Sequence, residues 1–262
     1  MGYVNYFAKD CLQQLPWQKI SQRGVLIVGC GKGLDCAEFT DFGWVHGVDV
    51  CRDLGRDFSH PKVTYFRESA EAMERQSDCY DLVFSVATLE HIHDLLSAFR
   101  EIYRVTKSGG LIYTVAAPLW NSAEGHHLKY LGLFSEFPWI HLRLSPTEIK
   151  NYIYANKTAV DLQDWIDILQ QEQLLSVPLV DGDLVSYAEN LVNFLSSDYF
   201  NRLPASCYIN GASQLPVNKL IRNELWQDGE TLLTPDVLIE LISKGFTKKE
   251  LLAVSHNYVA VK

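Results

Sequence analysis

The sequence has little of what marks secreted, metal-binding, membrane-spanning or nucleic-acid-binding proteins. Its six cysteines form no C-x-x-C pair and no disulfide-framework spacing, which argues against disulfide bonds and against a zinc site. It has no signal peptide and no long apolar run. Lysine and arginine number 23 against 32 aspartates and glutamates, and the resulting net charge of −9 disfavours nucleic acid as a partner. We therefore expect a cytoplasmic protein with reduced thiols, no metal, no membrane contact and a small-molecule substrate.

What the sequence does have is a glycine-rich turn directly after a buried strand. Residues 25–33 read V-L-I-V-G-C-G-K-G, so four apolar residues form a strand and three glycines break it before a short helix over 34–42. Glycine adopts positive φ and lacks a Cβ, so the backbone can turn sharply and a ligand can lie against its N–H groups. This strand, turn and helix together predict a cofactor cradle.

An acidic residue follows the next predicted strand. Trp44 to Val50 is apolar apart from Asp49 and His46, and Asp49 comes sixteen positions after Gly33. In a βαβ unit, an acid at the carboxyl end of the second strand reaches the ribose hydroxyls of a nucleoside that the first loop holds. A solvated acid at a strand end is the alternative, and the glycine loop favours the nucleoside.

Strands and helices alternate along the first half of the chain. Apolar runs predict further strands over 63–66, 82–85 and 111–116, and helical spacing predicts a helix from 95 to 103 that the Ser-Gly-Gly of 108–110 stops. Residues 68–70 open another helical segment that reaches Arg75. This alternation implies a mostly parallel sheet covered on both faces, with ligands beyond the carboxyl ends of its strands.

One stretch makes these features specific. The glycine loop, Asp49, the turn at 68–70 and the sequence Y-D-L-V-F-S-V-A-T-L-E-H-I over 80–92 resemble the class I S-adenosylmethionine-dependent methyltransferases, in particular the methyltransferase type 11 group. The resemblance covers residues 20–118 well and the last thirty residues loosely. It differs from the nicotinamide fingerprint G-x-G-x-x-G, because Leu34 stands at the third glycine and Gly33 comes one position early.

The resemblance implies a fold and a cofactor. The fold is α/β, with a Rossmann-like, doubly wound, seven-stranded and mostly parallel sheet, a closing antiparallel hairpin and, in this chain, a helical lid insertion. The cofactor is S-adenosyl-L-methionine. By the resemblance, Gly29, Gly31 and Gly33 lie against its methionine and ribose portion, and Asp49 binds the ribose hydroxyls.

The resemblance also assigns the adenine and methionine ends of the cofactor. The family usually has an acid after the third strand to bind the adenine amino group, whereas this chain has Ser69 there. We assign that contact to Ser69 and the backbone of Ala70, with Glu68 as a substitute acid. Ser85 and Val86, at the end of the fourth strand, would flank the methionine end.

Histidines are the first candidates for a catalytic base. A sulfonium methyl is already activated, so transfer needs a nucleophile held close, its proton removable and water excluded. Gly125-His126-His127 follows the fifth strand in a polar loop, and a packing role in the core would not favour two adjacent ionisable rings. His91 would lie near the reaction centre. Structural hydrogen bonding is the alternative for all three histidines.

The segment 119–231 fits no motif of the sheet and predicts a mainly helical lid. Ser145-Pro146-Thr147-Glu148 has the pattern of a helix start, and apolar stripes predict helices over 160–172 and 184–195, whereas 201–218 reads as an irregular loop. A hairpin of 251–254 and 258–261 would close the sheet. We therefore expect one domain over 1–262, with a flap at 1–19, a core of 20–118 and 232–262, and this insertion.

These features predict an S-adenosylmethionine-dependent methyltransferase acting on a small polar acceptor. Trp120, Arg143 and Tyr208 are candidate substrate contacts, and a salt bridge within the lid is the alternative for Arg143. An oxygen of a sugar, a phosphorylated compound or another polar metabolite is favoured, because paired histidines and an arginine suit deprotonation and anion binding. An N-methyltransferase and a non-catalytic cofactor-binding module are the alternatives. The sequence carries no prediction of the oligomeric state.

Overall fold

The computed structural model describes residues 3–128 and 136–262, and the chain forms two compact units. We call residues 1–117, 205–226 and 255–262 the sheet unit, and residues 118–204 and 227–254 the helical unit. Each unit is therefore assembled from separate segments of the chain. Residues 205–226, which the sequence placed in the insertion, lie in the sheet unit, and much of 232–262, which it placed in the core, lies in the helical unit.

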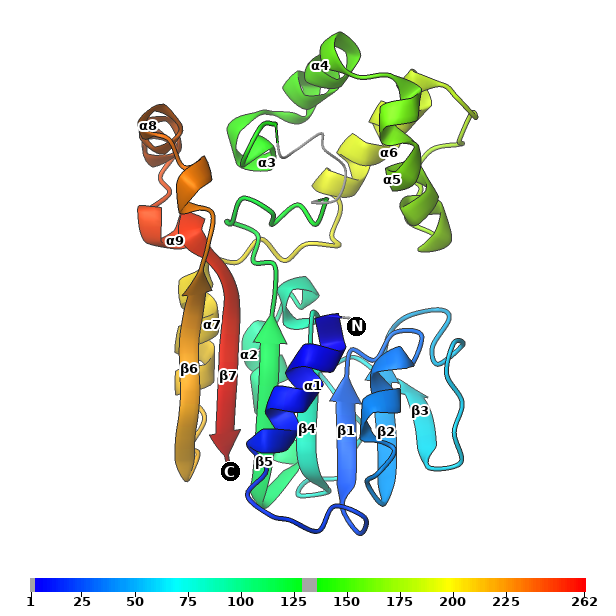
Figure 1. The fold of residues 1–262 in the computed structure, drawn as a ribbon, viewed down its shortest axis with the longest axis vertical. Coiled ribbons are helices and arrows are strands. Elements are labelled where there is room, and N and C mark those ends of the chain that lie inside the picture. Colours follow the sequence, from blue (N-terminus) through cyan, green and yellow to red (C-terminus); the bar gives the residue numbers. More distant parts are fainter. Residues whose placement is uncertain (1–2, 129–135) are drawn as a thin grey trace. The chain divides into compact units, whose positions relative to one another are not determined.

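A seven-stranded sheet has the strand order β3-β2-β1-β4-β5-β7-β6 (Figure 1). Strands β1 to β5 pair in parallel with their neighbours, and β7 runs antiparallel to β5. The predicted Rossmann-like, mostly parallel sheet with an antiparallel closure is confirmed. In chain order the strands are β1 Gly24–Val28, β2 Trp44–Asp49, β3 Val63–Arg67, β4 Tyr80–Val86, β5 Thr106–Ala116, β6 Lys219–Gln227 and β7 Ala253–Val261.

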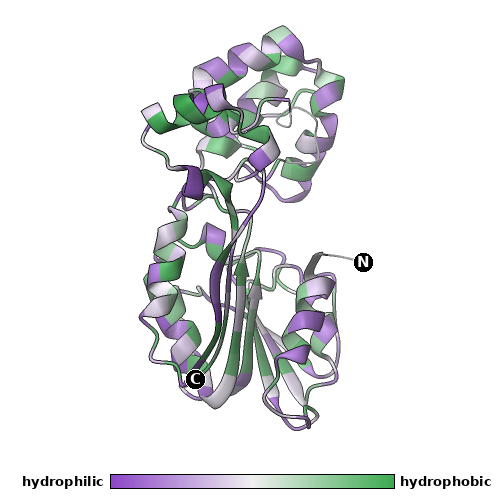
Figure 2. Cartoon of the chain, turned by 60° about the vertical axis from the view of Figure 1, so that its left-hand side comes forward, coloured by the Kyte–Doolittle hydropathy of each residue, from purple (hydrophilic) through white to green (hydrophobic). Residues whose placement is uncertain are grey.

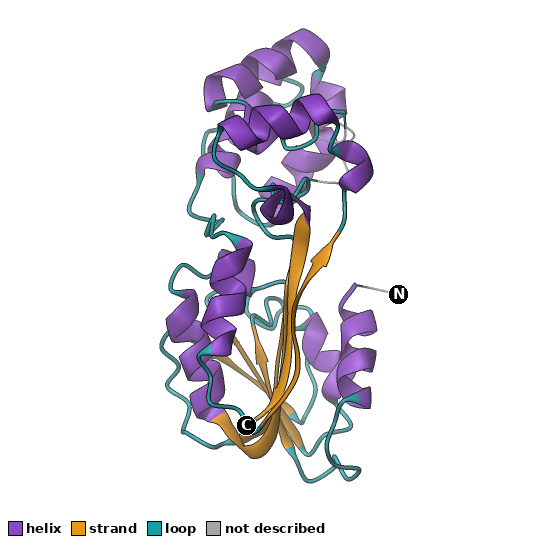
Figure 3. Ribbon diagram, turned by 90° about the vertical axis from the view of Figure 1, so that its left-hand side faces the viewer, coloured by secondary structure: helices purple, strands orange, loops and turns teal. Residues whose placement is uncertain are grey.

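Helices cover both faces of the sheet (Figures 1 and 3). α1 (Tyr3–Gln13) and the 3-10 helix η1 (Leu34–Phe39) lie on one face, and α2 (Leu95–Val105) and α7 (Ala205–Ser213) lie on the other. Strands β1 and β4 are therefore buried along their whole length, as the continuous apolar runs of central parallel strands require. Hydrophobic residues accordingly concentrate on the inner strands (Figure 2).

The segment 69–75, which we expected to be helical, is a turn. Side chains from α2 satisfy backbone groups that a helix would pair internally. The Glu101 carboxylate accepts the N–H of Met73 at 2.8 Å, and Arg104 donates to the carbonyl oxygens of Met73 at 2.9 Å and Arg75 at 2.7 Å. Because these partners lie about thirty residues away in the chain, the local sequence pattern could not show them.

The boundary between α2 and β5 also differs from the prediction. α2 ends at Val105, and β5 begins at the next residue, Thr106. The Ser-Gly-Gly of 108–110 therefore lies within the strand and does not end the helix. Gly109 adopts a φ of +75°, and its N–H donates to the carbonyl of Lys262 at 2.8 Å, which ties the start of β5 to the end of β7.

The antiparallel closure uses different residues from those predicted. Residues 251–254 and 258–261 do not form a hairpin, because 251–252 end α9 (Lys248–Leu252) whereas 253–254 and 258–261 belong to the single strand β7. The outer neighbour of β7 is β6, from the segment that the sequence assigned to the insertion. The predicted irregular loop at 201–218 contains α7.

The helical unit contains α3 (Ile140–Arg143), α4 (Pro146–Asn156), α5 (Ala159–Gln171), α6 (Leu184–Ser196), the 3-10 helix η4 (Glu230–Leu232), α8 (Pro235–Ser243) and α9. α4 begins with the predicted cap, since Ser145 and Glu148 form a reciprocal capping box. The predicted apolar stripes of α5 and α6 are buried in one hydrophobic cluster. Within the described ranges, every helix is too short or too polar to cross a bilayer.

Candidate functional site

The glycine loop after β1 has the backbone geometry of a ligand cradle. Gly29, Gly31 and Gly33 have φ values of +77°, +48° and +99°, in the left-handed region that favours glycine. A Cβ on Gly29 would lie 1.9 Å from the Thr88 side chain, and one on Gly33 would lie 2.4 Å from the hydroxyl of Tyr65. A Cβ on Gly31 would meet nothing within 4 Å. Two glycines therefore permit close packing, and Gly31 leaves open space beside its backbone.

Asp49 is fixed against this loop. Its Oδ2 accepts the N–H of Gly31 at 2.8 Å, and its Oδ1 accepts the N–H of Cys51 at 2.7 Å. The parallel pairing of β1 and β2 places the acid there, because Val28 is opposite Val48 and both strands end at this point. The sequence prediction that Asp49 and the glycine loop meet is therefore matched by the geometry.

Two exposed apolar side chains beside the loop were not predicted. Val50 follows Asp49 and is 69% exposed, and Leu34 follows Gly33 and is 61% exposed. An apolar side chain at the end of a parallel strand gains nothing from water, whereas it can pack on the face of an aromatic ring. In the sequence, the feature that could have indicated this surface is Val50, an apolar residue directly after Asp49.

The predicted adenine contacts in the loop after β3 lie in different environments. Glu68 is not a free acid, because its carboxylate accepts from the Arg75 guanidinium at 2.6 Å and from the N–H of Glu74 at 2.9 Å. Its carboxylate is therefore already paired within the chain, and its role as a substitute acid stays a prediction. Ser69 accepts the N–H of Glu71 at 3.2 Å, and Ala70 is buried.

The side chains at the end of β4 are buried, so a ligand there would meet mainly backbone groups. The side chain of Ser85 is fully buried, and in the part of the chain that the structure describes its hydroxyl has no hydrogen-bond partner. Val86 is also buried. Both residues occupy the predicted position at the carboxyl end of β4, and contact with a ligand there would fall to their backbone groups.

The short turn η2 (Leu89–His91), which follows β4, holds a buried carboxyl group beside an imidazole. Oε1 of Glu90 lies 3.9 Å from Nε2 of His91. Burial penalises the charged carboxylate and raises the pKa of Glu90 to about 8. At neutral pH Glu90 is therefore mainly protonated.

Replacing Glu90 with glutamine is expected to flatten the alkaline side of the stability profile. The folded-state pKa lies above the ordinary value of 4.5, so the stability that Glu90 contributes is fully present below about 4.5 and is lost as pH rises through about 8. Thermal unfolding of both proteins at about pH 6 and about pH 9 measures this. The wild type should lose more Tm over that interval than Glu90→Gln, and an equal loss would contradict the assignment.

Three of the predicted substrate-side residues lie in one aromatic cluster of the helical unit. The ring centroid of Trp120 is 4.6 Å from that of His141 and 4.8 Å from that of Phe200. The rings of His126 and His141 are 5.1 Å apart, and those of His127 and Phe200 are 5.2 Å apart. The adjacent histidines thus contact different neighbours.

The environments of the two histidines differ. His126 is 1% exposed, its Nδ1 accepts the N–H of Leu128 at 3.0 Å, and burial holds its pKa well below the usual range. His127 is only partly buried and has a φ of +60°, a strained conformation for a residue with a side chain. The structure therefore gives His126 the character of a neutral, buried ring, and leaves part of His127 accessible.

Arg143 and Tyr208 are engaged within their own units. The Nε and Nη2 atoms of Arg143 lie 2.9 and 2.8 Å from Oε2 of Glu240, and its guanidinium lies 4.1 Å from the centroid of the Phe137 ring. The salt bridge that the sequence left open is thus present. Tyr208 is fully buried on α7, with its ring 5.9 Å from that of His256. Both side chains are therefore already engaged within the chain, and a substrate contact at either residue stays a prediction.

Known proteins match this chain in its sequence. Residues 26–114 match the family model described as a methyltransferase domain. A ubiquinone biosynthesis O-methyltransferase of Rhodopseudomonas palustris is 27% identical over 182 residues, covering 64% of this chain and 67% of that protein. A protein of the same name from Bartonella tribocorum is 23% identical over 168 residues, covering 59% and 66%. The chain thus spans about two thirds of the length of these relatives.

Solved structures share the fold. An S-adenosylmethionine-dependent methyltransferase from Mesorhizobium loti has a TM-score of 0.51 at 12% identity, with 98% of both chains covered. Phosphoethanolamine N-methyltransferase 2 of Haemonchus contortus, solved with S-adenosyl-L-methionine, has a TM-score of 0.52 at 17% identity, with 97% of this chain and 52% of that chain covered. At these identities the likeness is one of fold alone.

Proposed function

We propose that this chain is a class I S-adenosylmethionine-dependent methyltransferase and that it transfers the methyl group of that cofactor to an oxygen atom of a small polar acceptor. The observation that carries the choice of oxygen is that the curated relatives are named O-methyltransferases. The open backbone at Gly31, with Asp49 held beside it, is the feature of this chain that fits the cofactor.

In this proposal the glycine loop and the residues around it each bind a different part of the cofactor. Gly31 lets the backbone approach the ligand, and Asp49 accepts hydrogen bonds from the ribose hydroxyls. Val50 and Leu34 offer apolar surface to the adenine ring, and Ser69 offers a hydroxyl to its polar edge. The backbones of Ala70, Ser85 and Val86, with those of Gly29 and Gly33, complete the cradle.

The chemistry leaves two tasks to the protein. When bound, S-adenosylmethionine supplies a methyl group already activated on its sulfonium sulfur. The protein must hold the acceptor oxygen and remove its proton, which a histidine with a pKa near the working pH does best. We assign removal of the acceptor's proton to His127, with His91 as the alternative. Both side chains are partly accessible, whereas His126 is buried.

The salt bridge of Arg143 bears on the acceptor. Glu240 already pairs with the guanidinium of Arg143, so this arginine no longer favours a phosphorylated acceptor. An uncharged polar acceptor with an ionisable hydroxyl group is therefore preferred.

An acceptor panel tests the proposal. The protein is incubated with S-adenosylmethionine and, in separate reactions, phenols, sugars, phosphorylated sugars and amines, and the formation of S-adenosylhomocysteine and the mass of the methylated product are measured. Methyl transfer to a hydroxyl group supports the proposal. Transfer only to amines contradicts it, and cofactor binding without turnover on every acceptor would favour a non-catalytic module.

Replacing Asp49 with alanine is expected to weaken S-adenosylmethionine binding by ~1–3 kcal/mol, or roughly 5- to 150-fold in Kd. The loss has two sources, because the carboxylate binds the ribose and also holds the N–H of Gly31. Titration calorimetry measures the affinity. Asp53→Ala is the matched control, since Asp53 pairs with Arg56 at 2.8 Å on the surface and should leave the affinity unchanged. Equal affinities for the two variants would refute the role of Asp49.

A further inference from the structure

The outer edge of β6 is unpaired within the described residues. β6 is the last strand in the sheet order, with β7 on one side. All nine of its residues are exposed or only partly buried, and these include Leu220 at 55% and Trp226 at 37% exposure. Figure 3 views the molecule from this side, with helices on both faces of the sheet. A strand edge with unpaired N–H and C=O groups is a template for another strand.

The sequence of β6 is complementary to itself when read in the opposite direction. In an antiparallel pair of two β6 strands related by a twofold axis at Asn223, Arg222 is opposite Glu224 of the second copy. In the same register, Leu220 is opposite Trp226 of the second copy. Opposite charges and large apolar side chains are the cross-strand pairs that stabilise antiparallel sheets.

Neighbouring registers are disfavoured. Moving the twofold axis by one residue places either Arg222 opposite Arg222 or Glu224 opposite Glu224. Like charges directly opposite each other destabilise a strand pair, so the sequence of β6 selects the register centred on Asn223.

Arg222 is held in place by partners in its own chain. It donates two hydrogen bonds to Asp10 of α1, at 2.6 and 2.9 Å, and Tyr113 donates to the same carboxylate at 2.7 Å. A guanidinium has five N–H groups, so donors remain for a second carboxylate. Because the arginine is held before association, less side-chain entropy is lost on pairing.

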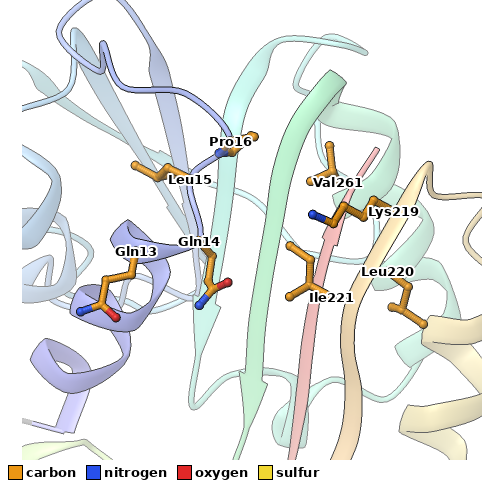
Figure 4. A pocket seen from close by; sticks show the side chains of 8 residues that line it. All are labelled: Gln13, Gln14, Leu15, Pro16, Lys219, Leu220, Ile221 and Val261. Atoms are coloured by element: carbon orange, nitrogen blue, oxygen red, sulfur yellow. The ribbon is translucent and has the colours of Figure 1, made fainter.

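An apolar hollow lies at the beginning of β6. It has a volume of about 580 Å³, and its apolar lining comes from Leu15, Pro16, Leu220, Ile221 and Val261 (Figure 4). In the register centred on Asn223, the indole of Trp226 from the second copy lies beside Leu220, at this hollow. Tryptophan seated in an apolar hollow is a frequent source of binding energy at protein interfaces.

We propose that two copies of this chain associate through β6. Their sheets then join into one continuous antiparallel sheet across a twofold axis at Asn223, and Trp226 of each copy covers the hollow of the other. Such an interface is isologous, so the same residues act on both sides and the assembly closes at two copies.

Measurement of the molar mass in solution is the first test. Light scattering after size exclusion, at concentrations up to about 100 µM, should give about twice the 29.8 kDa of the chain, because such concentrations populate a dimer of micromolar Kd. A monomer throughout this range would overturn the proposal.

Charge substitutions test the register itself. L220E/W226E and L220K/W226K should each be monomeric, because like charges then face each other at both positions, whereas an equal mixture should form a mixed dimer. Thermal unfolding beside the wild type verifies the fold of each variant, and Leu220→Lys alone should also weaken the dimer if the change at Trp226 impairs folding. Ile239→Lys, at a residue of α8 that is 67% exposed, is the control and should leave the dimer intact. Dimers of both double variants, or a mixture that stays monomeric, would overturn the proposal.

Discussion

Replacing Gly31 with leucine is expected to abolish binding of S-adenosylmethionine while the protein stays folded. The side chain would enter the space beside the loop, where a Cβ meets nothing within 4 Å, and that is the space we assign to the cofactor. A side chain in the left-handed conformation costs about 1–2 kcal/mol, which a domain of ordinary stability tolerates. We expect a loss of more than about 100-fold in affinity, since the ligand and the side chain cannot occupy one volume. Calorimetric titration and the Tm are the measurements.

Gly109→Leu is the matched control. Gly109 also has a positive φ, of +75°, and a Cβ there also meets nothing within 4 Å, but it lies at the start of β5, away from the carboxyl ends of the strands. It should show the same loss of Tm and normal affinity. If both variants bind the cofactor normally, the open space at Gly31 is not the cofactor site.

Alanine at His127 is expected to lower kcat by roughly 10²–10⁴-fold, the usual worth of a general base. Binding of S-adenosylmethionine should be unchanged, because we assign His127 to the acceptor. His126→Ala is the matched variant. Since His126 is a buried ring that accepts the N–H of Leu128, its loss should lower the Tm and leave kcat per folded molecule largely intact.

The alternative base is tested in the same experiment. If His91→Ala causes the large loss of kcat and His127→Ala does not, the proton is removed at His91, next to the carboxyl of Glu90. If none of the three variants loses kcat, the proposal of a histidine base is wrong. The acceptor would then ionise without a base from this set.

The central strands could be predicted because burial on both faces demands continuous apolar runs, as in V-L-I-V of β1. β6 could not, because at the edge of the sheet its residues alternate neither in polarity nor in burial. The sequence did not predict α7, because Gly211 is typical of a loop. In the structure, a Cβ at Gly211 would lie 3.1 Å from the ring of Phe99, so the glycine serves close packing of α7 on α2.

For the candidate site, local motifs were informative and long-range partners were not. The meeting of Asp49 and Gly31 follows from strand order, which the alternation of strands and helices implies. The partner of Arg143 is Glu240, almost a hundred residues away, and the partner of Glu68 is Arg75, across a turn that the sequence suggested was helical. No spacing rule reveals such pairs, because tertiary packing decides them.

The two-segment construction of the helical unit has a consequence for inheritance. Trp139, in the first segment, packs in one cluster with Leu241 and Leu251 of the second, and Arg143 pairs with Glu240 across the same two segments. A single recombination event that replaced residues 118–204 would leave these partners mismatched. Changes in the part of the chain outside the sheet must therefore be inherited as matched pairs of segments, and among relatives we expect residues of 118–204 to covary with residues of 227–254.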